Sequence, residues 1–203
     1  MNTRKHEHFG WLTAGAVIVT AVATMSQPAV AALEDDETKA QLGAVGIFGV
    51  AGVVAPENAE SDLVLGAGVD LGSLWQPWLK VTAGVSHWSA AIDRQAYGQD
   101  VDGTLSDTRL YTNLGTELFA IKSIRPYLNA GVALHFVGAD VPSDPSLQSA
   151  LQGTHVGGEV GFGAVAHRGA ITLGAGARRE FVSNAKNWTF TIGIGTNWTP
   201  ASR

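Results

Sequence analysis

His87 and Ser89 form the one pair in this sequence whose residue types and spacing could support catalysis. They lie in VSHWSA, residues 85–90. Residues two apart on an extended chain share a face, so the imidazole could serve as a base and the hydroxyl as a nucleophile. The spacing assigns no carboxylate to orient the histidine. Polar side chains of this kind also border apolar surfaces without any catalytic role, and we expect that role here.

An acidic stretch, GQDVDGTLSD at residues 98–107, is the second candidate site, since it places Asp100, Asp102 and Asp107 near Gly103. Carboxylates bind Ca²⁺ or Mg²⁺, but this segment lacks the ligand spacing of an EF-hand loop. We therefore expect a solvated loop. The histidines also lack metal-ligand spacing, so no metal or cofactor is predicted; those considered are His6, His8, His135, His155 and His167.

The composition predicts a folded chain and excludes several classes of protein. Of 203 residues, 45% are hydrophobic and 15% charged, which is incompatible with a disordered tail. The absence of cysteine excludes disulfides, thiolate metal sites and a lipidated cysteine. A net charge of −5, without clustered Lys or Arg, argues against nucleic-acid binding.

The N-terminal segment has the features of a secretory signal peptide at residues 1–31. Arg4 and Lys5 precede the apolar run WLTAGAVIVTAVATM, and Ala29 and Ala31 supply the small residues of a cleavage site. The run is shorter than the roughly 20 residues of a spanning helix. We expect export, with residues 32–41 forming an acidic periplasmic leader.

The rest of the chain alternates apolar and polar residues and shows no sustained helical period. Eight such segments are expected to be strands, each about long enough to cross a bilayer when tilted: 42–54, 62–73, 77–89, 108–120, 125–137, 154–167, 170–182 and 187–198. Tight connections alternate with mostly longer polar ones, as in outer-membrane barrels with short periplasmic turns. The sequence predicts an all-β, eight-stranded antiparallel up-and-down transmembrane β-barrel over residues 42–198, followed by a tail at 199–203.

The composition of the two strand faces indicates which of them meets lipid. In the fifth segment Leu128, Val132 and Phe136 share one face, while the opposite face carries Asn129 and Gly131. Across the segments the polar face is mostly glycine with a few charges, which suits the crowded interior of a small barrel better than a wet exterior. We therefore expect the apolar face to point outward. A soluble barrel with that face inside, carrying a small ligand, is the alternative.

Aromatic residues are expected to border the apolar band. Trp188 and Trp198 share the outward face ten residues apart, which corresponds to roughly 33 Å of strand, or about 25 Å of height at the tilt of such barrels. Phe136 also ends a strand. These three residues are predicted to belong to an aromatic girdle.

Charged residues on the inward face need partners, because burying an unpaired charge is costly. A two-residue turn at Arg168-Gly169 would place Glu159 opposite Arg178. A three-residue turn at 74–76 would place Asp70 opposite Lys80, and Glu117 is a further inward charge. We interpret these interior ion pairs as packing devices rather than as a gate for ions.

With these features, and with motifs such as PYLNAGVAL and ITLGAGAR, the chain resembles the small outer-membrane barrels of the OmpA/OmpX type, often called porin-like. The resemblance covers residues 42–198. It implies a monomer in the cell outer membrane, in contact with lipid and lipopolysaccharide and inserted by the outer-membrane assembly machinery. That family usually ends in an aromatic residue, whereas here TPASR follows Trp198.

The function predicted first is a structural or loop-mediated interaction role without enzymatic activity. Three alternatives stay open: a narrow channel for ions or small solutes, a lipid A hydrolase using His87 and Ser89, and the soluble ligand-binding barrel. Outer-membrane lipid A deacylases use a His-x-Ser pair late in the chain, followed by Asn. Here the pair lies in the third strand and Ala90 follows it.

Overall fold

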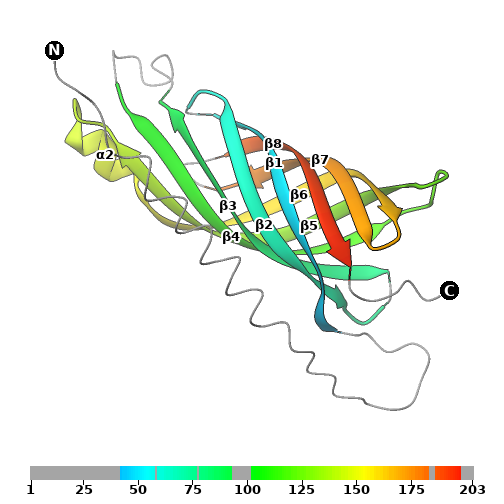
Figure 1. The fold of residues 1–203 in the computed structure, drawn as a ribbon. Coiled ribbons are helices and arrows are strands. Elements are labelled where there is room, and N and C mark those ends of the chain that lie inside the picture. Colours follow the sequence, from blue (N-terminus) through cyan, green and yellow to red (C-terminus); the bar gives the residue numbers. More distant parts are fainter. Residues whose placement is uncertain (1–41, 58, 77, 93–101, 183–185, 198–203) are drawn as a thin grey trace. The chain divides into compact units, whose positions relative to one another are not determined.

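The computed structural model describes residues 42–57, 59–76, 78–92, 102–182 and 186–197, and eight strands in them form a closed antiparallel barrel (Figure 1). Each strand pairs with the next, and β8 pairs with β1. The strands are β1 (Leu42–Pro56), β2 (Asp62–Ser73), β3 (Leu79–Ala91), β4 (Thr104–Glu117), β5 (Ile124–Asp140), β6 (Gly153–Arg168), β7 (Ile171–Phe181) and β8 (Asn187–Asn197). The predicted fold class is confirmed. The signal peptide, the leader and the tail lie outside the described residues.

Strand β4 differs most from the expected boundaries, because it begins at Thr104 rather than at residue 108. Thr104 pairs with Ala91 of β3 and with Asp140 of β5. The end of the acidic stretch is therefore a strand rather than a loop. β3, β4 and β5 extend beyond their neighbours at this end of the barrel, as the cyan-green to green strands of Figure 1 show.

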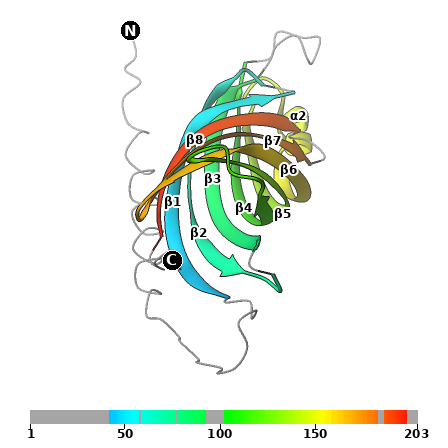
Figure 2. The same ribbon diagram turned by 90° about the vertical axis from the view of Figure 1, so that its right-hand side faces the viewer.

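The connections sort into two ends of the barrel, as the sequence predicts. Residues 74–78, 118–123 and 169–170 connect strands at what we call the turn end. At the opposite end, the loop end, the chain passes from β1 to β2, from β3 to β4, from β5 to β6 and from β7 to β8. Figure 2 shows the strands curving around to close the barrel between these ends.

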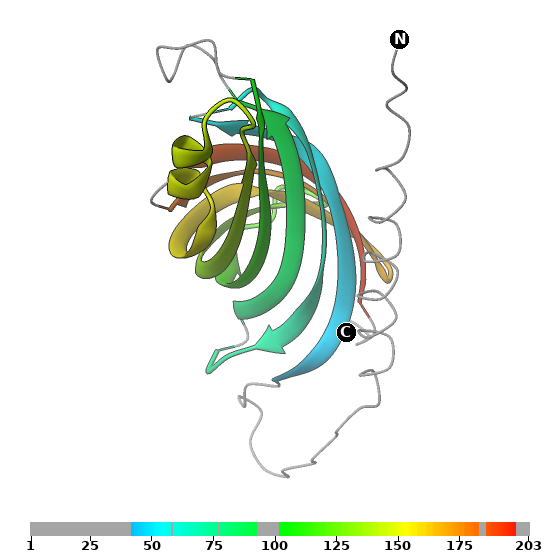
Figure 3. The same cartoon turned by 90° about the vertical axis from the view of Figure 1, so that its left-hand side faces the viewer.

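A short helix, α2 (Pro145–Leu151), interrupts the loop between β5 and β6 and lies at the loop end (Figure 3). No helix was predicted here from the sequence, although Asp144 followed by Pro145 is a common start of a helix. The Asp144 carboxylate accepts hydrogen bonds from the hydroxyl of Ser146 and from the backbone N–H groups of Ser146 and Leu147. These bonds, that of the hydroxyl first, lower the pKa of Asp144 from its ordinary 3.8. None of the helices in the described parts of the chain combines the length and apolarity needed to span a membrane.

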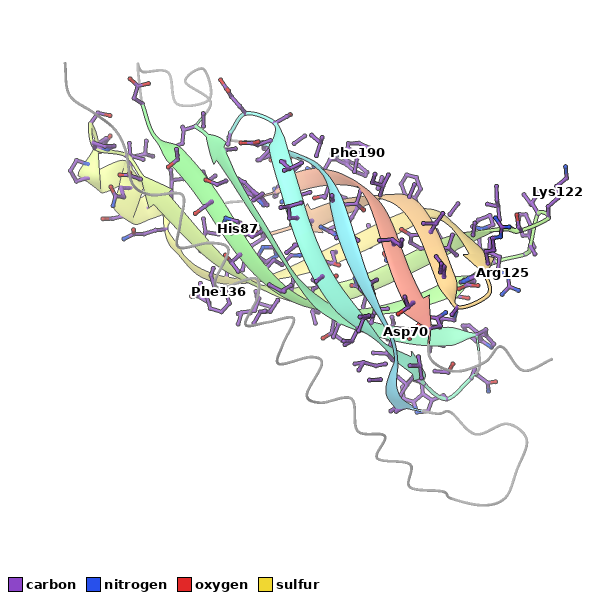
Figure 4. The ribbon with its side chains drawn as sticks, viewed as in Figure 1. Asp70, His87, Lys122, Arg125, Phe136 and Phe190 are labelled. Atoms are coloured by element: carbon purple, nitrogen blue, oxygen red, sulfur yellow. The ribbon has the colours of Figure 1, made fainter. Side chains whose placement is uncertain are left out.

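The apolar face points away from the barrel, as predicted. Val132 is 62% exposed and Phe190 is 54% exposed. In Figure 4 the labelled side chains of Phe136 and Phe190 extend outward from the ribbon. Side chains of opposite parity, such as Glu159 and His135, are buried inside. A soluble barrel with its apolar face inside does not fit this arrangement.

Glycines on the inward face make room for aromatic rings from the neighbouring strand. Phe48 lies across Gly68, and Tyr111 lies across Gly84. A Cβ atom at Gly68 would lie 2.5 Å from the Phe48 ring, and one at Gly84 would lie 2.5 Å from the Tyr111 hydroxyl. These contacts explain why so many glycines face a lumen too narrow for two large side chains at one level.

The loop half of the lumen is filled by hydrophobic side chains, which we call the apolar plug. They are buried and in mutual contact, and they come from strand ends, loops and α2: Val54, Ala59, Val64, Trp88, Ala90, Ile92, Leu105, Val137, Val141, Leu151 and Val182. Leu105, Val54 and Val141 have no solvent-exposed surface. The interior is therefore sealed from the loop end by packed hydrocarbon.

Candidate functional site in the barrel lumen

The hairpin between β6 and β7 places a different residue opposite Glu159 from the one expected. Arg168 pairs with Ile171, so the two-residue turn is Gly169-Ala170 and not Arg168-Gly169. Gly169 has φ +63°, which glycine adopts without strain at the first turn position of a hairpin. The register therefore moves by two residues. Glu159 lies opposite Glu180, and Arg178 lies opposite Gly161.

Two carboxylates directly opposite each other repel, and Arg109 from β4 compensates by reaching across the lumen. Its Nη1 atom donates to Glu159 Oε2 and, at 2.7 Å, to Glu180 Oε1. Its Nε atom lies 3.2 Å from Ser86 Oγ. Arg109 and both glutamates are 2% exposed. The centre of the site is thus an arginine shared by two buried glutamates.

Arg178 contacts the same two glutamates from a partly exposed position. Its Nε atom lies 2.8 Å from Glu180 Oε1 and 3.9 Å from Glu159 Oε2. The expected proximity of Glu159 and Arg178 thus occurs, but as a long diagonal contact. The expectation that they face each other directly was wrong, because a two-residue shift keeps the face and changes the partner.

A second group of polar side chains lies beside Arg109. His135 Nδ1 lies 2.7 Å from Asp107 Oδ2. Asn187 Nδ2 donates to Glu180 Oε2 at 2.8 Å, and Asn113 Nδ2 donates to Glu159 Oε1 at 2.7 Å. We call the six ionisable residues of this network the ion cluster: Asp107, Arg109, His135, Glu159, Arg178 and Glu180. It lies below the apolar plug, with Trp88 of the plug directly opposite Asp107.

The turn half of the lumen contains a cavity of about 260 Å³. Inward glycines of β7 and β8 leave part of this space empty, and Tyr111, Tyr127 and Arg178 line it together with residues of the turn end. Tyr111 stacks beneath Arg109, whose guanidinium carbon lies 4.3 Å from the ring centre. The cavity therefore ends where the ion cluster begins.

The charged residues near the turn end pair differently from the prediction. Lys80 Nζ lies 2.7 Å from Glu117 Oε1, and Arg125 and His167 also contact that carboxylate, at 3.1 and 3.2 Å. Asp70 lies opposite Thr82 rather than Lys80, and it accepts a hydrogen bond from the Gly72 N–H.

The cause of this second register error is a bulge together with a longer turn. Gly72 has φ +82°, the pairing shifts between Asp70 and Ser73, and the connection runs over residues 74–78 instead of 74–76. The predicted Asp70–Lys80 register is therefore wrong, whereas the inward orientation of both side chains is correct, since both line the cavity.

His87 and Ser89 lie on the outward face, as expected. His87 Nδ1 lies 2.9 Å from Thr108 Oγ1 of the adjacent strand, and Ser89 lies opposite Ser106. The carboxylate next in sequence to Thr108, that of Asp107, points inward to His135. The described contacts thus place the histidine in a pair with a threonine hydroxyl.

The acidic stretch does not form one site. Asp102 is exposed, Asp107 is buried in the lumen, and Asp100 lies outside the described residues. The expected solvated loop therefore includes Asp102 and excludes Asp107, because β4 begins early enough to carry Asp107 inside.

Two of the three predicted girdle residues are visible on the outer surface. Trp188 is 39% exposed and Phe136 is 43% exposed, whereas Trp198 lies outside the described residues. The structure adds Trp75, Trp78 and Phe119, which are exposed at the turn end. Trp75 lies in a predicted turn, whereas Trp78 and Phe119 fell at the turn-end limits of the predicted segments 77–89 and 108–120, which the structure places in connections.

The sequence analysis also missed Arg109, Asp107 and His135 as partners in the lumen. Parity alone places all three on the inward face of β4 and β5. Arg109 reaches Glu180 of β7 across the barrel, whereas Asp107 and His135 contact each other between the adjacent strands β4 and β5. A hairpin register does not predict contacts across a lumen.

Comparison with known proteins finds the same fold at low sequence identity. No protein-family model matches the sequence, and no curated protein matches it significantly. Neisserial surface protein A is 13% identical with a TM-score of 0.53, over 75% of this chain and 96% of that one. The N-terminal β-barrel domain of Pseudomonas aeruginosa OprF is 14% identical with a TM-score of 0.48, over 78% of this chain and 99% of that one.

The outer membrane enzyme PagL is also similar, at 16% identity and a TM-score of 0.44, over 75% of this chain and 99% of that one. Identities this low leave activity to be argued from the residues of this chain. Together with the closed sheet and its outward apolar face, the likeness to Neisserial surface protein A shows that the chain has the eight-stranded β-barrel fold of small outer-membrane proteins.

Proposed function

We propose that this chain is an integral outer-membrane protein that works as a monomeric, closed barrel and acts through its loops in a structural or interaction role, without enzymatic activity. The observation that carries the proposal is the contrast between the two faces of the sheet. The outer face is apolar, whereas the lumen is filled by the ion cluster and the apolar plug. A wall of this kind requires hydrocarbon outside and admits no solute from the loop end.

The packing of the lumen argues against the channel alternative. The cavity at the turn end stops at Tyr111 and Arg109. Beyond it a passing ion would have to separate Arg109 from both glutamates and then displace Leu105, which is fully buried. Each step disrupts packed groups of a dry interior, so conduction is unfavourable.

The contacts of the outward polar pair argue against the hydrolase alternative. A nucleophilic serine needs a base in hydrogen-bond reach and a third group that orients the base. Here one contact of His87 Nδ1 is with Thr108 Oγ1, a hydroxyl rather than an orienting carboxylate, and the carboxylate of Asp107 contacts His135 in the lumen. We expect the pair to contact lipid and lipopolysaccharide as part of the polar rim of the barrel.

The loop end is the part of the barrel that we propose to meet a partner. β3, β4 and β5 extend there beyond the other strands, and α2 lies above β5 and β6 (Figures 1 and 3). Loops on a rigid scaffold commonly carry binding function. We expect the assembly machinery of the outer membrane to insert the chain with this end facing outward.

Planar-bilayer recordings test the closed lumen. We expect the wild-type protein to give no discrete conductance steps. The matched variant is Trp88→Ala, which removes the largest side chain of the plug at its contact with the ion cluster. Steady, voltage-independent openings of the wild type would support the channel alternative and refute the proposal.

Two further measurements address the remaining alternatives. We expect the protein in the outer-membrane fraction, with an unheated band that migrates differently from the boiled one on a gel; recovery in the soluble fraction would refute membrane insertion. We also expect lipid A mass spectra to be the same for the wild type and for His87→Ala. Loss of an acyl chain that depends on His87 would establish the hydrolase instead.

A further inference from the structure

The ion cluster has an excess of negative charge that its arginines do not balance. It contains the three carboxylates of Asp107, Glu159 and Glu180, against the two guanidinium groups of Arg109 and Arg178. All three carboxylates are at most 2% exposed. Because an uncompensated buried charge is unfavourable, a further cation beside these carboxylates would be stabilised.

The geometry places that cation beside His135. Asp107 of β4, His135 of β5 and Glu180 of β7 each offer one ligand atom, and these atoms lie within 4.8 Å of one another. All three side chains are buried. Two ligands of one Zn²⁺ ion lie at most about 4.2 Å apart, so a small inward movement would bring all three into a coordination sphere.

Unused hydrogen-bonding capacity is a second, independent observation. His135 Nε2 and Asp107 Oδ1 are buried and make no hydrogen bond to any described residue. Their other polar atoms, His135 Nδ1 and Asp107 Oδ2, contact each other. Most buried polar atoms of a folded protein have a partner, so the orphaned Asp107 Oδ1 points to a missing ligand beside the three residues, whereas His135 Nε2 faces Gly157 on the side of the ring away from Asp107.

We propose that Asp107, His135 and Glu180 bind one divalent transition-metal ion of the Zn²⁺ type in the barrel lumen. The ion supplies the positive charge that the two arginines leave unbalanced, and it ties β4, β5 and β7 together across the lumen. An imidazole nitrogen with carboxylate oxygens suits Zn²⁺ and its neighbours, whereas Ca²⁺ and Mg²⁺ prefer oxygen alone. Glu180 Oε2 accepts a hydrogen bond from Asn187 and Oε1 accepts from Arg109 and Arg178, so the ion would share one of these oxygens.

The spacing of these residues along the chain, 28 and 45 positions apart, gives no recognisable metal motif. For that reason the sequence predicted no metal. Closure of the barrel brings β4, β5 and β7 together at one level of the lumen. The metal site does not depend on whether the barrel is a closed structural protein or a channel.

The competing explanation is that His135 is a protonated imidazolium, which would supply the same charge without a metal. Measurements of Zn²⁺ binding and of thermal unfolding distinguish the two explanations. A metal site binds Zn²⁺ stoichiometrically and raises the thermal unfolding temperature in the presence of the ion. An imidazolium site does neither.

The test uses the full chain without an affinity tag, stripped with EDTA and refolded in detergent with or without ZnCl2. Isothermal titration calorimetry measures Zn²⁺ binding after refolding, and elemental analysis measures Zn²⁺ retained from refolding. We expect one ion per barrel, and at least about a tenfold loss of affinity in His135→Gln and in Asp107→Asn. The matched control replaces every other histidine by glutamine (His6, His8, His87, His155 and His167) and should still bind one ion.

Absence of Zn²⁺ from the wild type after both treatments would overturn the proposal and leave the imidazolium. Binding that survives in His135→Gln, or that is lost in the control retaining only His135, would also overturn it. If His135→Gln does not fold, as judged by its gel mobility, Cu²⁺ paramagnetic resonance on the control decides the question. A nitrogen hyperfine signal there supports the site, and a spectrum with oxygen ligands alone refutes it.

Discussion

Replacing Arg109 by methionine is the sharpest perturbation of the lumen, because Glu159 and Glu180 then lie opposite each other without their shared partner. Methionine fills similar space and contributes no charge. Two carboxylates about 5 Å apart repel by roughly 3 kcal/mol at an effective dielectric constant of 20. Breaking a buried ion pair generally costs about 3–5 kcal/mol. We expect Arg109→Met to lower the free energy of unfolding by an amount in that range.

A double-mutant cycle separates this pairing from general packing. Adding Glu159→Gln to Arg109→Met removes the repulsion between the two carboxylates and should recover most of the loss. The same cycle between Glu159 and Arg178 should give a much smaller coupling, since that contact is 3.9 Å long and Arg178 is partly exposed. Comparing the two coupling energies is informative because Arg109 and Arg178 belong to the same ion cluster.

Urea unfolding in lipid vesicles, followed by tryptophan fluorescence and by gel mobility, measures these free energies. We expect a coupling above about 2 kcal/mol for Arg109 with Glu159 and below about 1 kcal/mol for Arg178 with Glu159. A coupling under about 0.5 kcal/mol for Arg109 would mean that the two residues are energetically independent. That result would refute the shared-arginine arrangement.

Three further predictions address the outer face, the orientation and α2. Val132→Arg should cost about 2–4 kcal/mol in vesicles if this exposed side chain meets hydrocarbon, while Val132→Leu should be close to neutral; equal stability of the two variants would contradict lipid contact. In intact cells a membrane-impermeant thiol reagent should label Ser143→Cys at the loop end and not Arg168→Cys at the turn end, and the opposite pattern would invert the topology. Because the pKa of Asp144 is lowered in the folded state, its cap on α2 is complete above the ordinary pKa of 3.8 and is lost as the pH falls through the lower folded-state value. The protection of α2 amides, measured relative to the intrinsic exchange rate at each pH, should therefore fall in acid in the wild type and be low at every pH in Asp144→Ala; an acid-dependent loss of protection that persists in the variant would exclude Asp144 as its cause.

The sequence predicted the strands and their faces well because both depend on a local pattern. Alternation of apolar and polar residues survives an error of two positions in the register, so Glu159 and Lys80 were placed inward correctly with the wrong cross-strand partners. The errors came from Gly169 and Gly72, whose positive φ angles define the turn and the bulge. Several glycines could have adopted these angles, and the sequence does not say which ones do.

The central contacts of the lumen depend on more than hairpin geometry. Arg109 reaches Glu180 because the sheet closes and places β4 across from β7, a relation fixed by strand tilt and stagger around the whole barrel. The early start of β4 likewise depends on pairing with both β3 and β5. Contacts that depend on such long-range pairing cannot be predicted from a local pattern in a single sequence.

The rings that lie across inward glycines should also constrain how this chain can evolve. Gly84 cannot acquire a side chain while Tyr111 occupies the space above it, and a smaller residue at Tyr111 would leave a void there unless Gly84 grew. Phe48 and Gly68 are coupled in the same way. Related barrels should therefore change these positions together, exchanging large and small residues between strands, so that correlated substitutions would report the register of this sheet without a structure.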